Sequence, residues 1–82
     1  MRTITKEHAA SVRSVARLYG ATSVRIRRHT TWGDAVVVVM PTGVAAVYLL
    51  RPGEWMATSA WHTATARNPS VAFQELMGVR VP

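Results

Sequence analysis

Two neighbouring segments of the chain carry different hydropathy patterns, and together they restrict the fold. Residues 35–40 are apolar at every position, whereas residues 23–29 alternate between apolar and cationic side chains. A continuous β-branched run is typical of a strand covered on both faces, and an alternating run is typical of a strand with one face in water. A sheet that contains both is expected to place an apolar strip beside a basic one, and something besides its own helices would cover that strip.

The length of the chain restricts it to one hydrophobic core. Its 82 residues contain no cysteine, so neither a disulfide nor a zinc–thiolate site can reinforce the fold. A core of this size is marginal without tight packing or oligomerisation. We therefore predict a single domain over residues 1–82 that is a homo-oligomer, such as a dimer, or part of a larger assembly.

Nothing in the sequence predicts export or a membrane span. The first seven residues are charged and have no apolar segment behind them, and the apolar-rich stretch 35–50 is interrupted by residues 41–43 (Pro-Thr-Gly). That stretch is too short to cross a bilayer. The absence of cysteine also suits a reducing compartment. We expect a cytoplasmic protein that makes no membrane contact.

Helix signals stand near both ends of the chain. Thr5 can cap a helix over residues 6–19, and Gly20 fits the left-handed residue that ends it. Residues 68–69 (Asn-Pro) match the cap and first position of a second helix, which Gly78 would end.

Between the two helices the sequence predicts a sheet. Residues 23–29, 35–40 and 44–50 are predicted strands, and residues 55–63 fit either a fourth strand or a helix. The turn signal at residues 52–53 (Pro-Gly) favours the strand. The predicted fold is α+β: an N-terminal helix, an antiparallel sheet of three to four strands and a C-terminal helix, in a two-layer sandwich.

The order of one helix, three strands and a second helix is similar to that of the double-stranded RNA-binding domain. In that family the second helix begins with a group of lysines that clamp phosphates. The corresponding residues here, 68–72 (Asn-Pro-Ser-Val-Ala), include no lysine. The likeness extends only to the order of the elements, and the family's phosphate clamp is not expected in this chain.

The charge of the chain is strongly positive. Ten Lys and Arg residues face four Asp and Glu residues, for a formal net charge of +6, and Lys6 is the only lysine. Arginine presents a planar fork to phosphate and carboxylate groups, so this bias favours anion recognition. The same composition is also what a GC-rich genome encodes, as in small proteins of actinobacteria and their phages, and both explanations stay open.

The sequence gives little support to catalysis. The four acidic residues are scattered over different predicted elements, and the three histidines are far apart without the spacing of a helical zinc site. No glycine-rich phosphate loop or nucleophile elbow is present. We therefore expect a protein that is not an enzyme and has no cofactor and no metal site.

A basic strand face is the first candidate site. Arg25, Arg27 and His29 recur at every second residue, which places them about 7 Å apart along one side of a strand. Phosphates along a nucleic acid strand recur at a comparable spacing. The further candidates are the helix cations and an aromatic in a predicted loop: Lys6, Arg13, Arg17 and Trp32. These residues predict a nucleic-acid-binding accessory or regulatory protein, although charges on an edge strand can also simply prevent unwanted pairing.

An apolar sheet face is the alternative site. If both helices cover one face, half of each apolar strand faces outward, and such patches mark interfaces. The residues predicted to form this interface are Val37, Val39, Val47 and Leu49. Tyr48, Trp55 and Trp61 are predicted core residues. The corresponding function is a protein-interaction module, either an inhibitor of a host protein or a small subunit of an assembly such as a phage particle, with an acidic partner. Helices on opposite faces would instead leave nothing exposed.

Overall fold

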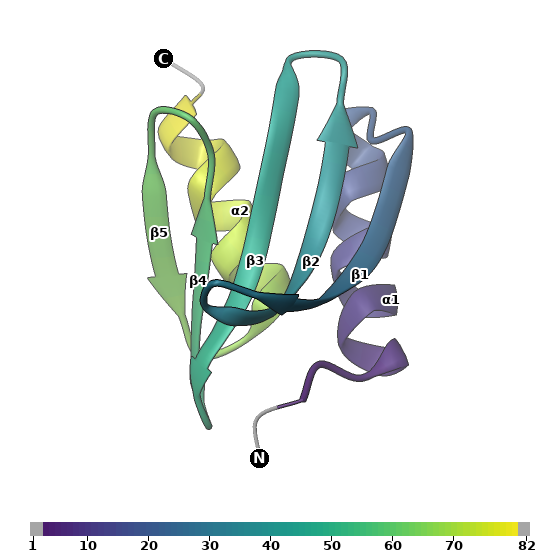
Figure 1. The fold of residues 1–82 in the computed structure, drawn as a ribbon. Helices are drawn as coiled ribbons and strands as arrows, with labels where there is room; N and C mark the ends of the chain where they lie inside the picture. Colours follow the sequence, from purple (N-terminus) through teal and green to yellow (C-terminus); the bar gives the residue numbers. More distant parts are fainter. Residues whose placement is uncertain (1–2, 81–82) are drawn as a thin grey trace.

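The computed structural model describes residues 3–80, apart from the side chains of His29, Val79 and Arg80. Two helices accompany a five-stranded antiparallel sheet whose strands lie side by side in chain order (Figure 1). The elements are α1 (Lys6–Ala16), a 3-10 turn (Arg17–Tyr19), β1 (Ser23–Thr30), β2 (Gly33–Met40), β3 (Gly43–Arg51), β4 (Glu54–Thr58), β5 (Thr63–Ala66) and α2 (Pro69–Arg80).

The α+β class is confirmed, but the prediction of three to four strands is wrong. Residues 55–63 do not form one element: β4 ends at Thr58, the chain turns, and β5 begins at Thr63. The turn closes through a hydrogen bond of 2.9 Å from the Ser59 N–H to the His62 carbonyl. The Ser59 hydroxyl also accepts hydrogen bonds from the N–H groups of Trp61 and His62. A serine hydroxyl thus stabilises a turn that contains neither glycine nor proline.

The first helix begins where its cap predicts and ends earlier than predicted. Thr5 accepts a hydrogen bond from the His8 N–H at 3.3 Å, and the His8 ring accepts one from the Thr5 N–H at 3.1 Å. This reciprocal pair satisfies two backbone donors of the first turn. The α-helix stops at Ala16 and tightens into the 3-10 turn before Gly20, whose φ is 83°. That left-handed conformation suits glycine.

The second helix begins at the predicted residue and continues past its predicted end. Its first turn includes a hydrogen bond of 2.9 Å from the Ala72 N–H to the Asn68 carbonyl. The prediction that Gly78 ends the helix is wrong, because the helix runs on through Arg80. Phe73 is fully buried and contacts the ring of Tyr19 edge to face at 5.9 Å.

Both helices lie on the same face of the sheet, so the molecule has two layers (Figure 1). α1 packs on β1 and β2, α2 packs on β3, β4 and β5, and the helices contact each other. We call the helix-covered side the inner face and the opposite side the outer face. The inner face holds the core, whose largest fully buried side chains are Phe73, Ile4, Leu76, Val12, Val36, Val38 and Val47. Within residues 3–80, no helix is long and apolar enough to cross a bilayer.

The strand register corrects two of the predicted interface residues. A two-residue turn pairs Met40 with Gly43, and Val37 therefore lies opposite Ala46. Val37 is half-buried on the outer face, and Val39 on the same face is 37% exposed. Val47 is fully buried and Leu49 packs against the core, both on the inner face. Neither of those two can belong to an outward interface.

Candidate nucleic-acid interface

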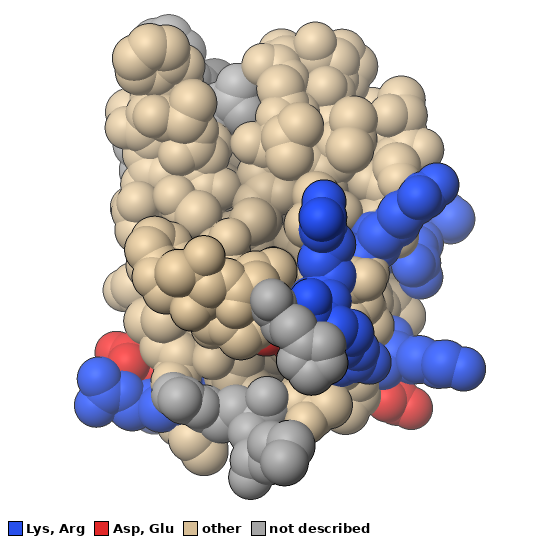
Figure 2. Space-filling view, viewed as in Figure 1, with Lys and Arg blue, Asp and Glu red and all other residues tan. Residues whose placement is uncertain are grey.

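The outer face carries an uncharged strip that the helices leave open. We call this surface the outer strip. Its residues come from three neighbouring strands and are Val37, Val39, Val44, Ala46, Tyr48 and Met56. In the space-filling view, the blue side chains gather mainly on the β1 side, and the larger part of the face is tan (Figure 2). An apolar surface beside cations is therefore present on one face, as the two hydropathy patterns predict.

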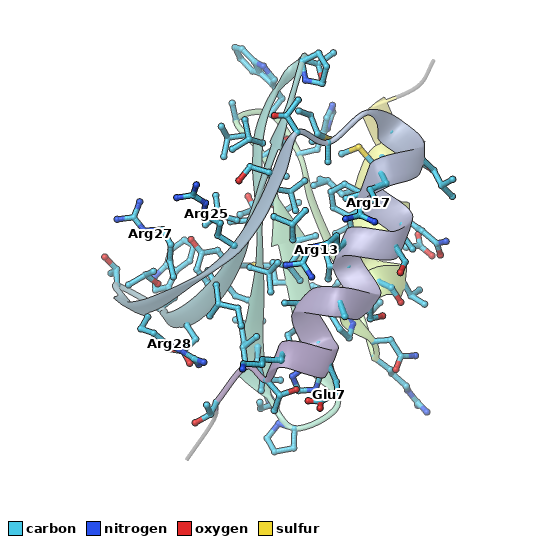
Figure 3. The ribbon with its side chains drawn as sticks, turned by 90° about the vertical axis from the view of Figure 1, so that its right-hand side faces the viewer. Glu7, Arg13, Arg17, Arg25, Arg27 and Arg28 are labelled. Atoms are coloured by element: carbon cyan, nitrogen blue, oxygen red, sulfur yellow. The ribbon has the colours of Figure 1, made fainter. Side chains whose placement is uncertain are left out.

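Arg25 and Arg27 border the outer strip. They lie opposite Val37 and Ala35 in the β1–β2 ladder, and both are exposed. Viewed from the β1 edge, both side chains extend away from α1 (Figure 3). Among the described residues, neither guanidinium has a hydrogen bond or an ion pair. Their charges are therefore available to an anion, at a spacing of about 7 Å along the strand.

Arg28 has a different role from its two neighbours. Its guanidinium forms an ion pair with the Asp34 carboxylate and donates a hydrogen bond of 2.9 Å to the Ile4 carbonyl. Asp34 also accepts from the Ile4 N–H at 3.4 Å, and its side chain is only 12% exposed. This cluster joins the segment before α1 to the β1–β2 hairpin. Asp34, the acidic residue nearest to Arg25 and Arg27 in the sequence, is thus paired with Arg28.

The β1–β2 turn brings Trp32 to the outer face. The ladder shifts register between Arg27 and Thr30, and such irregularities increase local strand twist. The tip of the hairpin then crosses in front of the sheet (Figure 1). Trp32 is 60% exposed, and its ring meets Tyr48 edge to face at 5.4 Å. The prediction that Tyr48 is a core residue is therefore wrong: its half-buried ring lies on the outer face.

The three helix cations lie on the other layer. Arg13 donates a hydrogen bond of 3.1 Å to the Val24 carbonyl of β1, whereas Lys6 and Arg17 are exposed. Arg13 and Arg17 project from α1 on the opposite side of β1 from the two strand arginines (Figure 3). The edge formed by α1 and β1 thus has cations on both layers. The predicted contribution of the His29 side chain lies outside the described residues.

A groove runs along β1 and β2 on the outer face. Its volume is about 550 Å³, within the size range of sites that hold small molecules. The residues that line it are Ser23, Arg25, Ile26, Arg27, Val37 and Val39. One wall is therefore cationic, and the opposite wall is apolar.

The remaining tryptophans fall into two classes. Trp55 is a core residue as predicted, with 4% of its surface exposed and its ring 4.7 Å from that of His8. Trp61 is 84% exposed in the β4–β5 turn, so the prediction that it is buried is wrong. This turn lies at the opposite end of the sheet from the β1–β2 turn (Figure 1). Trp61 and Trp32 are thus two exposed indoles in separate places.

The described acidic and histidine side chains form no metal centre. Within residues 3–80, no three of them gather in a group that could hold a metal ion. Glu7 is exposed in the first turn of α1, where hydrogen bonds from its own backbone and from Thr5 lower the pKa of its carboxyl. Glu54 forms an ion pair of 2.7 Å with Arg51.

Comparison with protein-family models, with curated proteins and with solved structures finds no match to this chain. Its function must therefore be inferred from the residues and their geometry.

Proposed function

We propose that this chain is a non-catalytic nucleic-acid-binding accessory or regulatory protein that acts in the cytoplasm and contacts the phosphate backbone. The observation that carries the proposal is the shared outer face of Arg25, Arg27 and Trp32. The two guanidiniums have no partner among the described residues, and the indole, which contacts Tyr48 on the same face, is 60% exposed. Phosphate-binding forks next to an aromatic ring are the parts that a nucleic acid strand requires.

The electrostatics of the chain support the same proposal. A formal net charge of +6 attracts a polyanion over a distance and accelerates the encounter. The Asp34 carboxylate forms an ion pair with Arg28, so its negative charge is already offset. Because the neighbouring surface is uncharged, a phosphate that binds there meets attraction from Arg25 and Arg27 with little opposing field.

Salt dependence tests this proposal. Each phosphate that the protein neutralises adds about 0.7 (single strand) to 0.9 (duplex) to the downward slope of log K against log salt. If two to five of the candidate cations bind phosphates, the slope lies between about −1.4 and −4.5. Fluorescence anisotropy with labelled DNA and RNA at 20 to 200 mM salt would measure it. Absence of binding at the lowest salt, or a flat dependence, would contradict the proposal.

A second candidate function rests on the end of the outer strip beside the β2–β3 turn, which shares Val39 with the groove. Val39 and Val44 face each other across β2 and β3 and are 37% and 55% exposed. A protein partner, or a second copy of the chain, could cover them, as in an inhibitor or a small assembly subunit.

Sedimentation velocity tests this second candidate. If the valine pair forms a symmetric dimer, Val44→Asp should shift the protein to monomer, because a carboxylate cannot be buried there without a partner. The exposed control Thr63→Asp, at the far edge of the sheet, should keep the dimer. A wild-type chain that sediments as a monomer at high concentration and binds no hydrophobic dye would count against this function.

A further inference from the structure

The groove on the outer face suits a nucleotide whose base is unpaired. Its cationic wall can hold a phosphate, whereas its other wall consists of Val37 and Val39. A duplex has phosphates on its outside and buries its base faces in the stack. If a duplex lay against Val37 and Val39, its phosphates there would lose water and gain no charged or hydrogen-bonding partner in exchange. An unpaired nucleotide instead offers a phosphate on one side and a free, weakly polar base face on the other.

The aromatic pair lies at a suitable place for such a base. Arg27, Ala35 and Tyr48 follow one another across three adjacent strands in the ladder. Two strand spacings separate Arg27 from Tyr48, which is about 10 Å. Trp32 packs edge to face on Tyr48 and keeps most of its own surface open. A phosphate on Arg27 can therefore be followed by a base that reaches the indole.

The side chains beyond the aromatic pair are also compatible with bases. Three threonines border the outer strip on β4 and β5: Thr58, Thr63 and Thr65. Hydroxyl groups can donate to or accept from the exposed edges of unpaired bases, and they carry no charge that would repel phosphate. No acidic side chain is among the described residues that line the groove.

We propose that the ligand of the outer face is single-stranded nucleic acid, with phosphates along Arg25 and Arg27 and a base stacked on Trp32. This inference rests on the proposed nucleic-acid-binding function and specifies the class of ligand. Stacking on an aromatic side chain tolerates every base, so the site binds single strands with little sequence preference.

The test compares a 15-nucleotide strand without self-complementarity with the same strand annealed to its complement. We expect the single strand to bind at least about 10-fold more tightly than the duplex at equal salt. Trp32→Ala should weaken single-strand binding by about 5- to 150-fold, the range measured for loss of one stacked base, and leave duplex binding unchanged. Trp61→Ala, which removes the other exposed indole, should change neither.

Two further variants separate stacking from a structural role of Trp32. Trp32→Leu keeps apolar bulk against Tyr48 but has no ring, and Trp32→Phe keeps a ring. We expect the phenylalanine variant to retain most of the single-strand affinity and the leucine variant to lose as much as Trp32→Ala. Circular dichroism of each variant checks that the fold is kept.

The outcomes distinguish this inference from the function on which it rests. Binding to duplex that equals or exceeds binding to the single strand, with no effect of Trp32→Ala, would overturn the inference and leave nucleic-acid binding in place. Equal losses for single strand and duplex, or equal behaviour of Trp32→Leu and Trp32→Phe, would also overturn it. Absence of binding to either ligand at low salt would refute both proposals.

Discussion

Phe73→Ala is expected to lower the free energy of unfolding by about 3–5 kcal/mol. Phe73 is the largest of the fully buried side chains, and it extends from α2 into the core that both helices share with the sheet. Its ring also contacts Tyr19 at the end of the first helical segment. The substitution leaves a cavity at the point where the two helices meet, and the neighbouring backbone can fill it only partly.

This loss is large in relation to the total stability of so small a domain. At about 0.05–0.15 kcal/mol per residue, a chain of this length has roughly 4–12 kcal/mol in all. Urea denaturation followed by circular dichroism would measure the change, and the midpoint should fall by at least about 2 M. Val71→Ala is the matched control, because Val71 lies on the same helix but is 37% exposed. It should change stability by less than about 0.5 kcal/mol. Equal effects of the two variants would show that α2 does not pack as described.

The sequence was sufficient for features that depend on local chemistry. The Thr5 cap, the left-handed Gly20 and the helix start at residues 68–69 each depend on a few adjacent residues. The different hydropathy patterns of residues 23–29 and 35–40 likewise indicated a sheet with an apolar strip beside arginines. These features can be predicted without knowing which parts of the chain pack on them.

The position of each side chain on a face depended on turn length, which the sequence did not determine. Treating residues 41–43 as a three-residue turn pairs Val37 with Val47, and both then face outward. The structure has a two-residue turn that pairs Met40 with Gly43 instead. Because side chains alternate along a strand, this change of one residue moves Val47 to the inner face and Tyr48 to the outer face.

The remaining differences arise from side chains that act over longer distances or without a standard signal. β5 consists of alternating Thr and Ala, a weak strand pattern, and it follows a turn held by the hydroxyl of Ser59. Arg28 pairs with Asp34 and donates a hydrogen bond to the Ile4 carbonyl. The segment before α1, which contains Ile4, lies beside Arg28 only because of the tertiary fold. The Trp32–Tyr48 contact likewise requires the hairpin tip to cross the sheet.

The double variant Arg25→Glu/Arg27→Glu should lower affinity for a single-stranded 15-mer by at least about 100-fold at 50 mM salt. The substitutions remove two phosphate contacts and place two carboxylates on the same wall of the groove. The loss of two phosphate contacts should also reduce the steepness of the salt dependence by about 1.4 in log–log slope. Both side chains are exposed and have no partner among the described residues, so the fold should be unaffected.

A matched charge reversal elsewhere separates a local site from general attraction. Arg51→Glu/Arg67→Glu also lowers the formal net charge from +6 by four, to +2, but at the end of β3 and between β5 and α2. Arg51→Glu breaks a surface ion pair and places a carboxylate opposite Glu54 in the ladder, but the Arg51 side chain is 74% exposed, so the cost in stability is small. If binding takes place at the outer face, this control should weaken it by about 10-fold or less. Equal losses in the two double variants would mean that the nucleic acid responds to net charge alone, and Arg25 and Arg27 would then not form a site.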